Sequence, residues 1–127
     1  MHRYVILAFL LVLVACASPS GSSPRPDANM ISLVEIAEAG TVDAYGLVQR
    51  LRPLWLQIRG PTSVSDMEQD VVVYLDGSRV GYTDELRNLQ AEDIETLQFL
   101  TPSRANNRFG LGHVNGAILV TTKSTTP

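Results

Sequence analysis

The residues of this 127-residue chain that could carry chemistry gather near its carboxyl end. His113 is the only histidine beyond the first few residues, and it lies in a glycine-rich segment from Gly110 to Gly116. Together with Asp70 and Asp76 it could form a metal or acid–base site, although a lone histidine among glycines more often makes hydrogen bonds in a turn. No nucleophile has a visible base beside it, so a hydrolase that uses His113 ranks last among the functions considered.

Two arginines come just before the glycine-rich segment. Arg104 and Arg108 are four residues apart, so they share one face of a predicted helix, where they could hold an anion or pair with carboxylates such as Glu92 or Glu95. The glycines follow this helix, whereas a phosphate cradle needs the amino terminus of a helix. We therefore predict no nucleotide site. The candidate binding residues are Arg104, Arg108, Gly110, Gly112, His113, Asn115 and Gly116.

The composition argues against several classes of function. Cys16 is the only cysteine, so the chain can form neither an intrachain disulfide nor a structural zinc site of the Cys/His type. The formal net charge is −3 and there is no basic block, which argues against a nucleic-acid partner. We predict a protein that is not an enzyme, with no catalytic residue, no metal and no cofactor.

The amino terminus has the pattern of an export signal. A short basic start precedes an apolar run over residues 4–14, which is shorter than the about 20 residues that span a bilayer. The run ends in Leu13-Val14-Ala15-Cys16, which resembles the lipobox of bacterial lipoproteins. The resemblance implies cleavage before Cys16 and acylation of its thiol and new amino group, so that the membrane is a partner through this lipid. The alternative is a free cysteine in a retained apolar helix.

The sequence after Cys16 predicts a tether and then one folded domain. Ala17, which follows the cysteine, resembles an outer-membrane sorting signal. Residues 17–29 are rich in proline and serine, show no periodicity and would reach roughly 20 Å as a flexible coil. The predicted organisation is a signal peptide over 1–15, a lipid-anchored tether over 16–30 and a domain over 31–127.

Three apolar runs, at 71–75, 94–100 and 117–121, predict the strands of a small mixed sheet. Asp76 and Gly77 form a turn signal after the first run, and residues 79–81 are expected to pair back briefly. Short helices would cover the sheet, which gives an α+β fold. They are predicted at 32–39 with a capping box from Ser32 to Glu35, at 41–52 with Thr41 as the cap, at 84–88 with Thr83 as the cap, and at 103–108.

The order of the motifs resembles the plug domain of TonB-dependent outer-membrane receptors. The motifs are Val73-Tyr74-Leu75-Asp76-Gly77, the segment 93–100, Ala105, Phe109-Gly110 and the segment 116–123. The resemblance implies the plug fold and an outer-membrane location. A receptor's membrane barrel does not follow Lys123 in this chain, so we do not carry the transport activity over.

From this resemblance we expect a lipid-anchored, plug-like binding module on the periplasmic side of the outer membrane. It would contact a barrel or another envelope protein through the loop 110–116 or an exposed strand edge. The alternative is a binder of a small ligand, such as a siderophore or an oligosaccharide. That function predicts a pocket lined by loops 60–70, 76–82 and 110–116.

Overall fold

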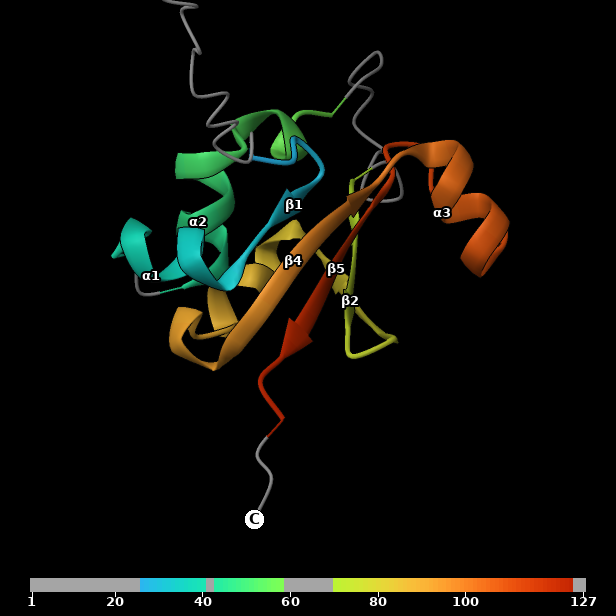
Figure 1. The fold of residues 1–127 in the computed structure, drawn as a ribbon. Coiled ribbons are helices and arrows are strands. Elements are labelled where there is room, and N and C mark those ends of the chain that lie inside the picture. Colours follow the sequence, from blue (N-terminus) through green and yellow to red (C-terminus); the bar gives the residue numbers. More distant parts are fainter. Residues whose placement is uncertain (1–25, 41–42, 59–69, 125–127) are drawn as a thin grey trace, which may run out of the picture.

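The computed structural model describes residues 26–40, 43–58 and 70–124. Its elements are β1 (Met30–Ile31), α1 (Leu33–Ala39), α2 (Ala44–Leu51), η1 (Pro53–Leu56), β2 (Val72–Leu75), β3 (Ser78–Tyr82), η3 (Thr83–Asn88), η4 (Ala91–Asp93), β4 (Ile94–Leu100), α3 (Pro102–Phe109) and β5 (Ala117–Thr122). The strands form one sheet in the order β1-β4-β5-β2-β3, in which β2 and β5 are parallel and all other neighbours are antiparallel (Figure 1). The predicted α+β fold with a small mixed sheet is therefore confirmed.

Strand β2 is apolar on both of its sides, and both sides are buried. Val73 belongs to the larger core, which it shares with α1, α2 and the 3-10 helices, while Val72 and Tyr74 face α3. Figure 1 shows α1 and α2 on one side of the sheet and α3 at the opposite side. Ala105 of α3 is fully buried, and its small side chain allows the helix to approach the sheet closely.

The turn between β2 and β3 forms where Asp76 and Gly77 predict it. Their φ angles are +47° and +86°, and two successive positive φ angles are typical of a tight two-residue hairpin. The Asp76 carboxylate accepts hydrogen bonds from the Thr122 N–H at 2.9 Å and from the Thr122 hydroxyl at 2.7 Å. These bonds lower the pKa of Asp76 and attach the hairpin to β5, the central parallel neighbour of β2.

Helix α1 has the predicted ends, whereas α2 begins differently. The side chains of Ser32 and Glu35 form a capping box, and Gly40 ends α1 in the left-handed conformation at φ +61°. Helix α2 is capped by Asp43, whose carboxylate accepts from the Gly46 N–H at 2.8 Å. Asp43 is therefore the cap, and Thr41, the predicted cap, lies outside the described residues.

Two further predictions about local structure are wrong. Thr83 does not cap the helix that it begins, because its hydroxyl donates to the Asp70 carboxylate at 2.7 Å. The tether predicted over 16–30 includes Met30, but Met30 pairs with Gln98 in β1, so the fold begins before residue 31. The pairing of residues 79–81 with β2 is confirmed as β3.

Candidate functional site

The predicted binding loop is divided between solvent and core. Gly110, Leu111 and Gly112 are exposed, and the Leu111 side chain keeps 94% of its accessible surface. His113 and Asn115 are buried, with 5% and 6% of their surface exposed, and Gly116 is buried as well. The sequence therefore locates a real loop, in which residues 110–112 and Val114 are accessible to another molecule while the other residues are buried.

His113 holds the loop in place through both of its ring nitrogens. Nδ1 lies 2.9 Å from the Gly110 carbonyl oxygen, and Nε2 lies 2.8 Å from the Tyr74 hydroxyl. A carbonyl can only accept, so Nδ1 carries a proton, and in that tautomer of the ring Nε2 accepts the Tyr74 hydrogen. The His113 N–H donates to the side chain of Asn106 in α3 at 3.0 Å. His113 is thus a hydrogen-bonding turn residue, as its glycine-rich surroundings indicate.

The replacement Tyr74→Phe should lower the free energy of unfolding by about 1–2 kcal/mol, since it leaves a buried acceptor on His113 without a donor. The stacking of Tyr74 on Phe109, with ring centroids 3.9 Å apart, is retained by phenylalanine. Urea unfolding of the two proteins measures the difference. The control is Tyr82→Phe, whose exposed hydroxyl accepts only a long bond from Arg79 at 3.3 Å and should cost at most a few tenths of a kcal/mol. Equal effects of the two replacements would contradict this role of His113.

The other predicted candidates do not come together into a site. Arg104 and Arg108 are both exposed on α3, and neither forms an ion pair with another described residue. Asp70 and Asp76 bond to Thr83 and Thr122 respectively, away from His113. Within the described residues, no three side chains of histidine, cysteine, aspartate or glutamate converge on a point where they could hold a metal ion.

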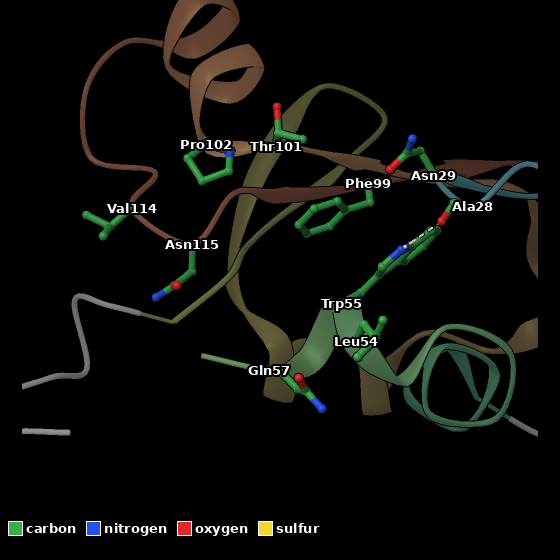
Figure 2. Close-up of a pocket in the computed structure, with 10 residues that line it drawn as sticks. All are labelled: Ala28, Asn29, Leu54, Trp55, Gln57, Phe99, Thr101, Pro102, Val114 and Asn115. Atoms are coloured by element: carbon green, nitrogen blue, oxygen red, sulfur yellow. Dashed lines mark hydrogen bonds between the residues drawn. The ribbon is translucent and has the colours of Figure 1, made fainter. Parts of the chain in front are cut away.

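A pocket of about 300 Å³ opens where β4 ends and α3 begins (Figure 2). Its floor includes Phe99, whose ring stacks on Trp55 with centroids 5.6 Å apart. We call it the β4 pocket, and its lining residues are Ala28, Asn29, Leu54, Trp55, Gln57, Phe99, Thr101, Pro102, Val114 and Asn115. None of these residues is charged, so the pocket suits a neutral group with apolar surface.

The β4 pocket differs from the one expected for a small-ligand binder. The loop 110–116 contributes Val114 and Asn115, but the hairpin 76–82 contributes nothing, and residues 60–69 lie outside the described part of the chain. Trp55 packs its segment onto the sheet, since it is 5% exposed, and it donates its indole N–H to the Ala28 carbonyl at 3.1 Å. The sequence gives no signal for Asn29, Gln57 or Thr101, which are polar residues in ordinary turn and strand positions.

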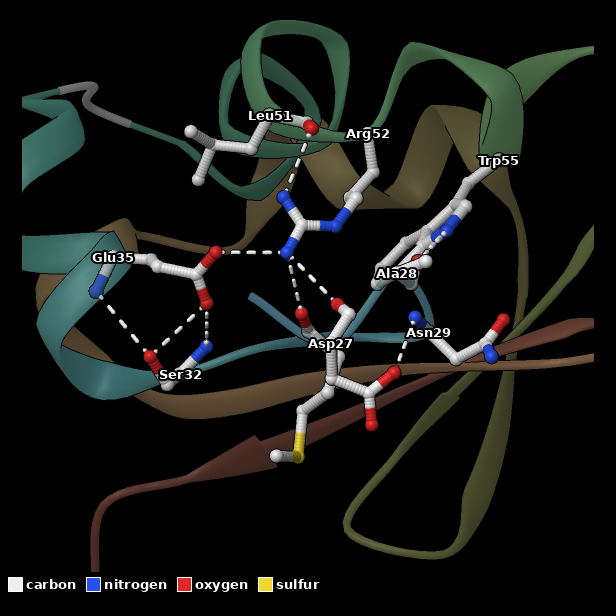
Figure 3. A network of polar contacts seen from close by, with 9 residues as sticks. Asp27, Ala28, Asn29, Ser32, Glu35, Leu51, Arg52 and Trp55 are labelled. Carbon is white, nitrogen blue, oxygen red and sulfur yellow. Dashed lines mark hydrogen bonds and ion pairs between the residues drawn. The ribbon is translucent and has the colours of Figure 1, made fainter. Parts of the chain in front are cut away.

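Hydrogen bonds from Arg52 hold the segment that forms the pocket wall at residues 28–29 (Figure 3). The Arg52 side chain donates to the carbonyls of Asp27 and Met30, both at 2.9 Å, and to the Glu35 carboxylate at 2.8 Å. It also donates to the Leu51 carbonyl at 3.0 Å. We call Arg52 and these acceptors the Arg52 cluster. It determines where the predicted tether joins the fold, and therefore the position of the pocket wall at residues 28–29.

Glu35 makes the stability of this cluster depend on pH. Burial by itself would raise the pKa of Glu35, but hydrogen bonds from Ser32 and Arg52 outweigh it and hold that pKa below its ordinary value. A carboxylate with a lowered pKa in the folded state stabilises the fold above its ordinary pKa, and this contribution is lost as pH falls through the folded value.

We expect Glu35→Gln to lower the free energy of unfolding at about pH 6, and the difference from the unchanged protein to shrink towards about pH 3. Urea unfolding over this pH range measures it. The control on the same helix is Glu38→Gln, whose exposed side chain should make the change in stability small. A Glu35→Gln difference that stays constant with pH would disprove this contribution.

Comparison of the chain with protein-family models, with curated proteins and with solved structures finds no match. In the part that the structure describes, no helix has the length and apolar character to cross a membrane. Cys16 and the rest of the predicted signal and anchor lie outside the described residues.

Proposed function

We propose that this chain is a lipid-anchored, non-enzymatic interaction module of the bacterial outer membrane, held at the periplasmic face through Cys16. The resemblance of Leu13-Val14-Ala15-Cys16 to a lipobox supports the anchor, and the resemblance to receptor plugs supports the location. The proposed partner is an outer-membrane barrel or another envelope protein.

One observation carries this proposal: the β4 pocket lies beside the start of the fold, and two exposed apolar side chains stand on its rim. Ala28 and Asn29, which follow the predicted tether directly, form part of the wall of the β4 pocket. Leu54 and Val114 line the same pocket while keeping 63% and 59% of their surface exposed. Exposed apolar groups around a concavity are typical of interaction sites.

The short distance to the membrane explains how a small surface could suffice. The predicted tether would reach roughly 20 Å, so the domain and a membrane-embedded partner share a small volume. Confinement of this kind raises the effective concentration, to about millimolar for short flexible linkers, so a weak contact can be occupied.

The anchor is tested by the replacement Cys16→Ser. The unchanged protein should fractionate with outer membranes, and mass spectrometry should find its amino-terminal peptide beginning at an acylated Cys16. The serine variant should lose the acyl mass and leave the membrane fraction. An unchanged protein that retains Met1 and lacks the lipid would refute the anchor.

The interaction is tested by photo-crosslinking in cells. A photoreactive residue placed at Leu111, the most exposed of the large apolar side chains described, should form adducts with a specific outer-membrane or periplasmic protein. The matched control is Val80 on β3, at the far edge of the sheet from β1, which is 40% exposed and should form none. Equal labelling from both positions would indicate random contact and oppose the proposal.

A small-ligand binder is the second candidate, and the volume of the β4 pocket favours it. About 300 Å³ lies at the lower end of the range for small-molecule sites. The uncharged lining favours a neutral oligosaccharide over a charged siderophore. Thermal-shift measurements with neutral oligosaccharides, siderophores and metal ions test this function, and a flat response to all of them would remove it.

A further inference from the structure

The pairing between β1 and β4 stops at Phe99, just before the carboxyl end of β4. The Phe99 N–H donates to the Asn29 carbonyl at 2.9 Å, which is the last bond between the two segments. Before Asn29 the chain turns away, because the Met30 N–H bonds back to the Asp27 carbonyl at 3.1 Å and the Asn29 N–H bonds to the Asp27 carboxylate at 2.9 Å. Within the described residues, the outer edge of β4 is therefore unpaired beyond the Phe99 N–H.

Two backbone groups are left on this unpaired edge. Both the N–H and the C=O of one residue in an antiparallel strand point to the same side, so the Phe99 carbonyl points to the edge that its N–H uses. The Thr101 N–H, two residues further along extended backbone, points there as well. Outside the strand ladder, neither group makes a hydrogen bond to another described residue, and β1 pairs only with Leu97 and Gln98. Phe99 and Thr101 both line the β4 pocket.

We propose that this edge of β4 binds a short, extended and uncharged peptide segment of the partner protein. The segment's backbone donates to the Phe99 carbonyl and accepts from the Thr101 N–H, and an apolar side chain enters the β4 pocket against Phe99. One acceptor and one donor at the spacing of a strand fit a peptide backbone, as in other cases of strand addition. The absence of charge from the pocket lining argues for an uncharged segment.

This inference rests on the proposed function, and it names the chemistry of the partner at that site. Strand addition over two backbone bonds is weak by itself, and the anchor supplies the effective concentration that it needs. A segment with an aspartate or lysine at the pocket position would have to leave that charge without a partner, which is unfavourable.

The sharpest variant is Thr101→Pro, because it removes the N–H and changes little else. Thr101 has φ −59° and ψ 157°, which proline adopts without strain and which also suits the residue before Pro102. Its N–H is unused in the described fold, so thermal unfolding should be nearly unchanged. Thr101→Val is the matched control, since it keeps the N–H and removes only the hydroxyl.

The readout is the adduct formed in cells from a photoreactive residue at Leu54, on the rim of the pocket. We expect an adduct with a protein, mapped by mass spectrometry to an uncharged extended segment. Its yield should fall roughly tenfold in Thr101→Pro and stay within about twofold in Thr101→Val. An adduct on a charged or helical segment, an adduct with a glycan or small molecule, or equal yields in the two variants would overturn the inference.

A second variant keeps the test decisive if Thr101→Pro proves unstable. Val114→Glu places a charge on the exposed rim of the pocket and should also reduce the adduct from Leu54, whereas Val80→Glu on β3 should not. An unchanged yield in Val114→Glu would count against the pocket. If the Leu111 adduct persists while the Leu54 adduct is absent or insensitive, the interaction module stands and strand addition fails. If both adducts are absent, the proposed function fails.

Discussion

Gly116→Ala should destabilise the protein by about 3–5 kcal/mol, a large part of the roughly 5–15 kcal/mol that holds a domain folded. Gly116 has φ +93°, and an added Cβ would collide with the Leu100 carbonyl oxygen and lie 3.0 Å from Phe99. The carbonyl cannot move away easily, since Leu100 pairs with Ala117 in the sheet. Backbone strain accounts for about 1–3 kcal/mol and overpacking for a similar amount.

The control is Gly112→Ala in the same loop. Gly112 also has a positive φ, of +110°, but nothing lies within 4 Å of an added Cβ, so only the backbone term applies. Urea unfolding of the two variants separates the terms, and Gly116→Ala should be the less stable by at least about 1 kcal/mol. Equal losses in the free energy of unfolding would mean that the contact with the Leu100 carbonyl does not contribute to the destabilisation.

Arg52→Ala should cost about 3–4 kcal/mol, because it removes one donor group from four acceptors. The Arg52 side chain is only 14% exposed and that of Glu35 is 21% exposed, so water replaces the lost bonds poorly. The variant should also loosen residues 27–30, which are one wall of the β4 pocket. Urea unfolding measures the first effect, and hydrogen exchange at the Met30 and Ile31 amides measures the second.

Arg52→Lys is the matched control for charge. Lysine keeps the positive charge near Glu35, but its single ammonium cannot donate to the spread of acceptors that the planar guanidinium reaches. It should therefore recover only part of the stability that alanine loses. Full recovery by lysine would show that charge alone matters, and a loss below about 1 kcal/mol in Arg52→Ala would show that solvent satisfies the acceptors.

The sequence predicts the centre of this fold well because strong local signals coincide there. The run at 71–75 is apolar on both faces, and the strand that it forms is covered on both faces. Asp76-Gly77 predicts the hairpin because few other pairs tolerate two positive φ angles. The Ser32–Glu35 spacing predicts the start of α1, because the capping box depends only on residues three apart.

The elements that it does not predict depend on distant partners. β1 has two residues, too few to show a period, and it is a strand only because Gln98 and Leu97 lie beside it. Thr83 and Asp43 are both good capping residues by type, but only Asp43 caps a helix. The Thr83 hydroxyl donates instead to the carboxylate of Asp70, which is distant in the sequence. Residue type therefore indicates which bonds are possible, while the fold selects among them.

The site is predicted least well, for the same reason. Glycine and histidine mark a loop, but residue type does not show that His113 and Asn115 would be buried. The β4 pocket is assembled from four stretches, around residues 28, 55, 100 and 115, none of which has a motif. Only Trp55, the single tryptophan, gives a hint, and its main role is to pack against Phe99.

The pairing of β1 with β4 also has a consequence for the order of folding. More than half of the chain lies between Ile31 and Leu97, which pair directly. Closing so long a loop costs entropy that two pairs of residues repay poorly, so β1 should dock after the other strands have assembled. Because so few residue pairs hold it, β1 should also be the first strand to detach when the protein is pulled from its amino terminus, while the rest of the sheet remains intact.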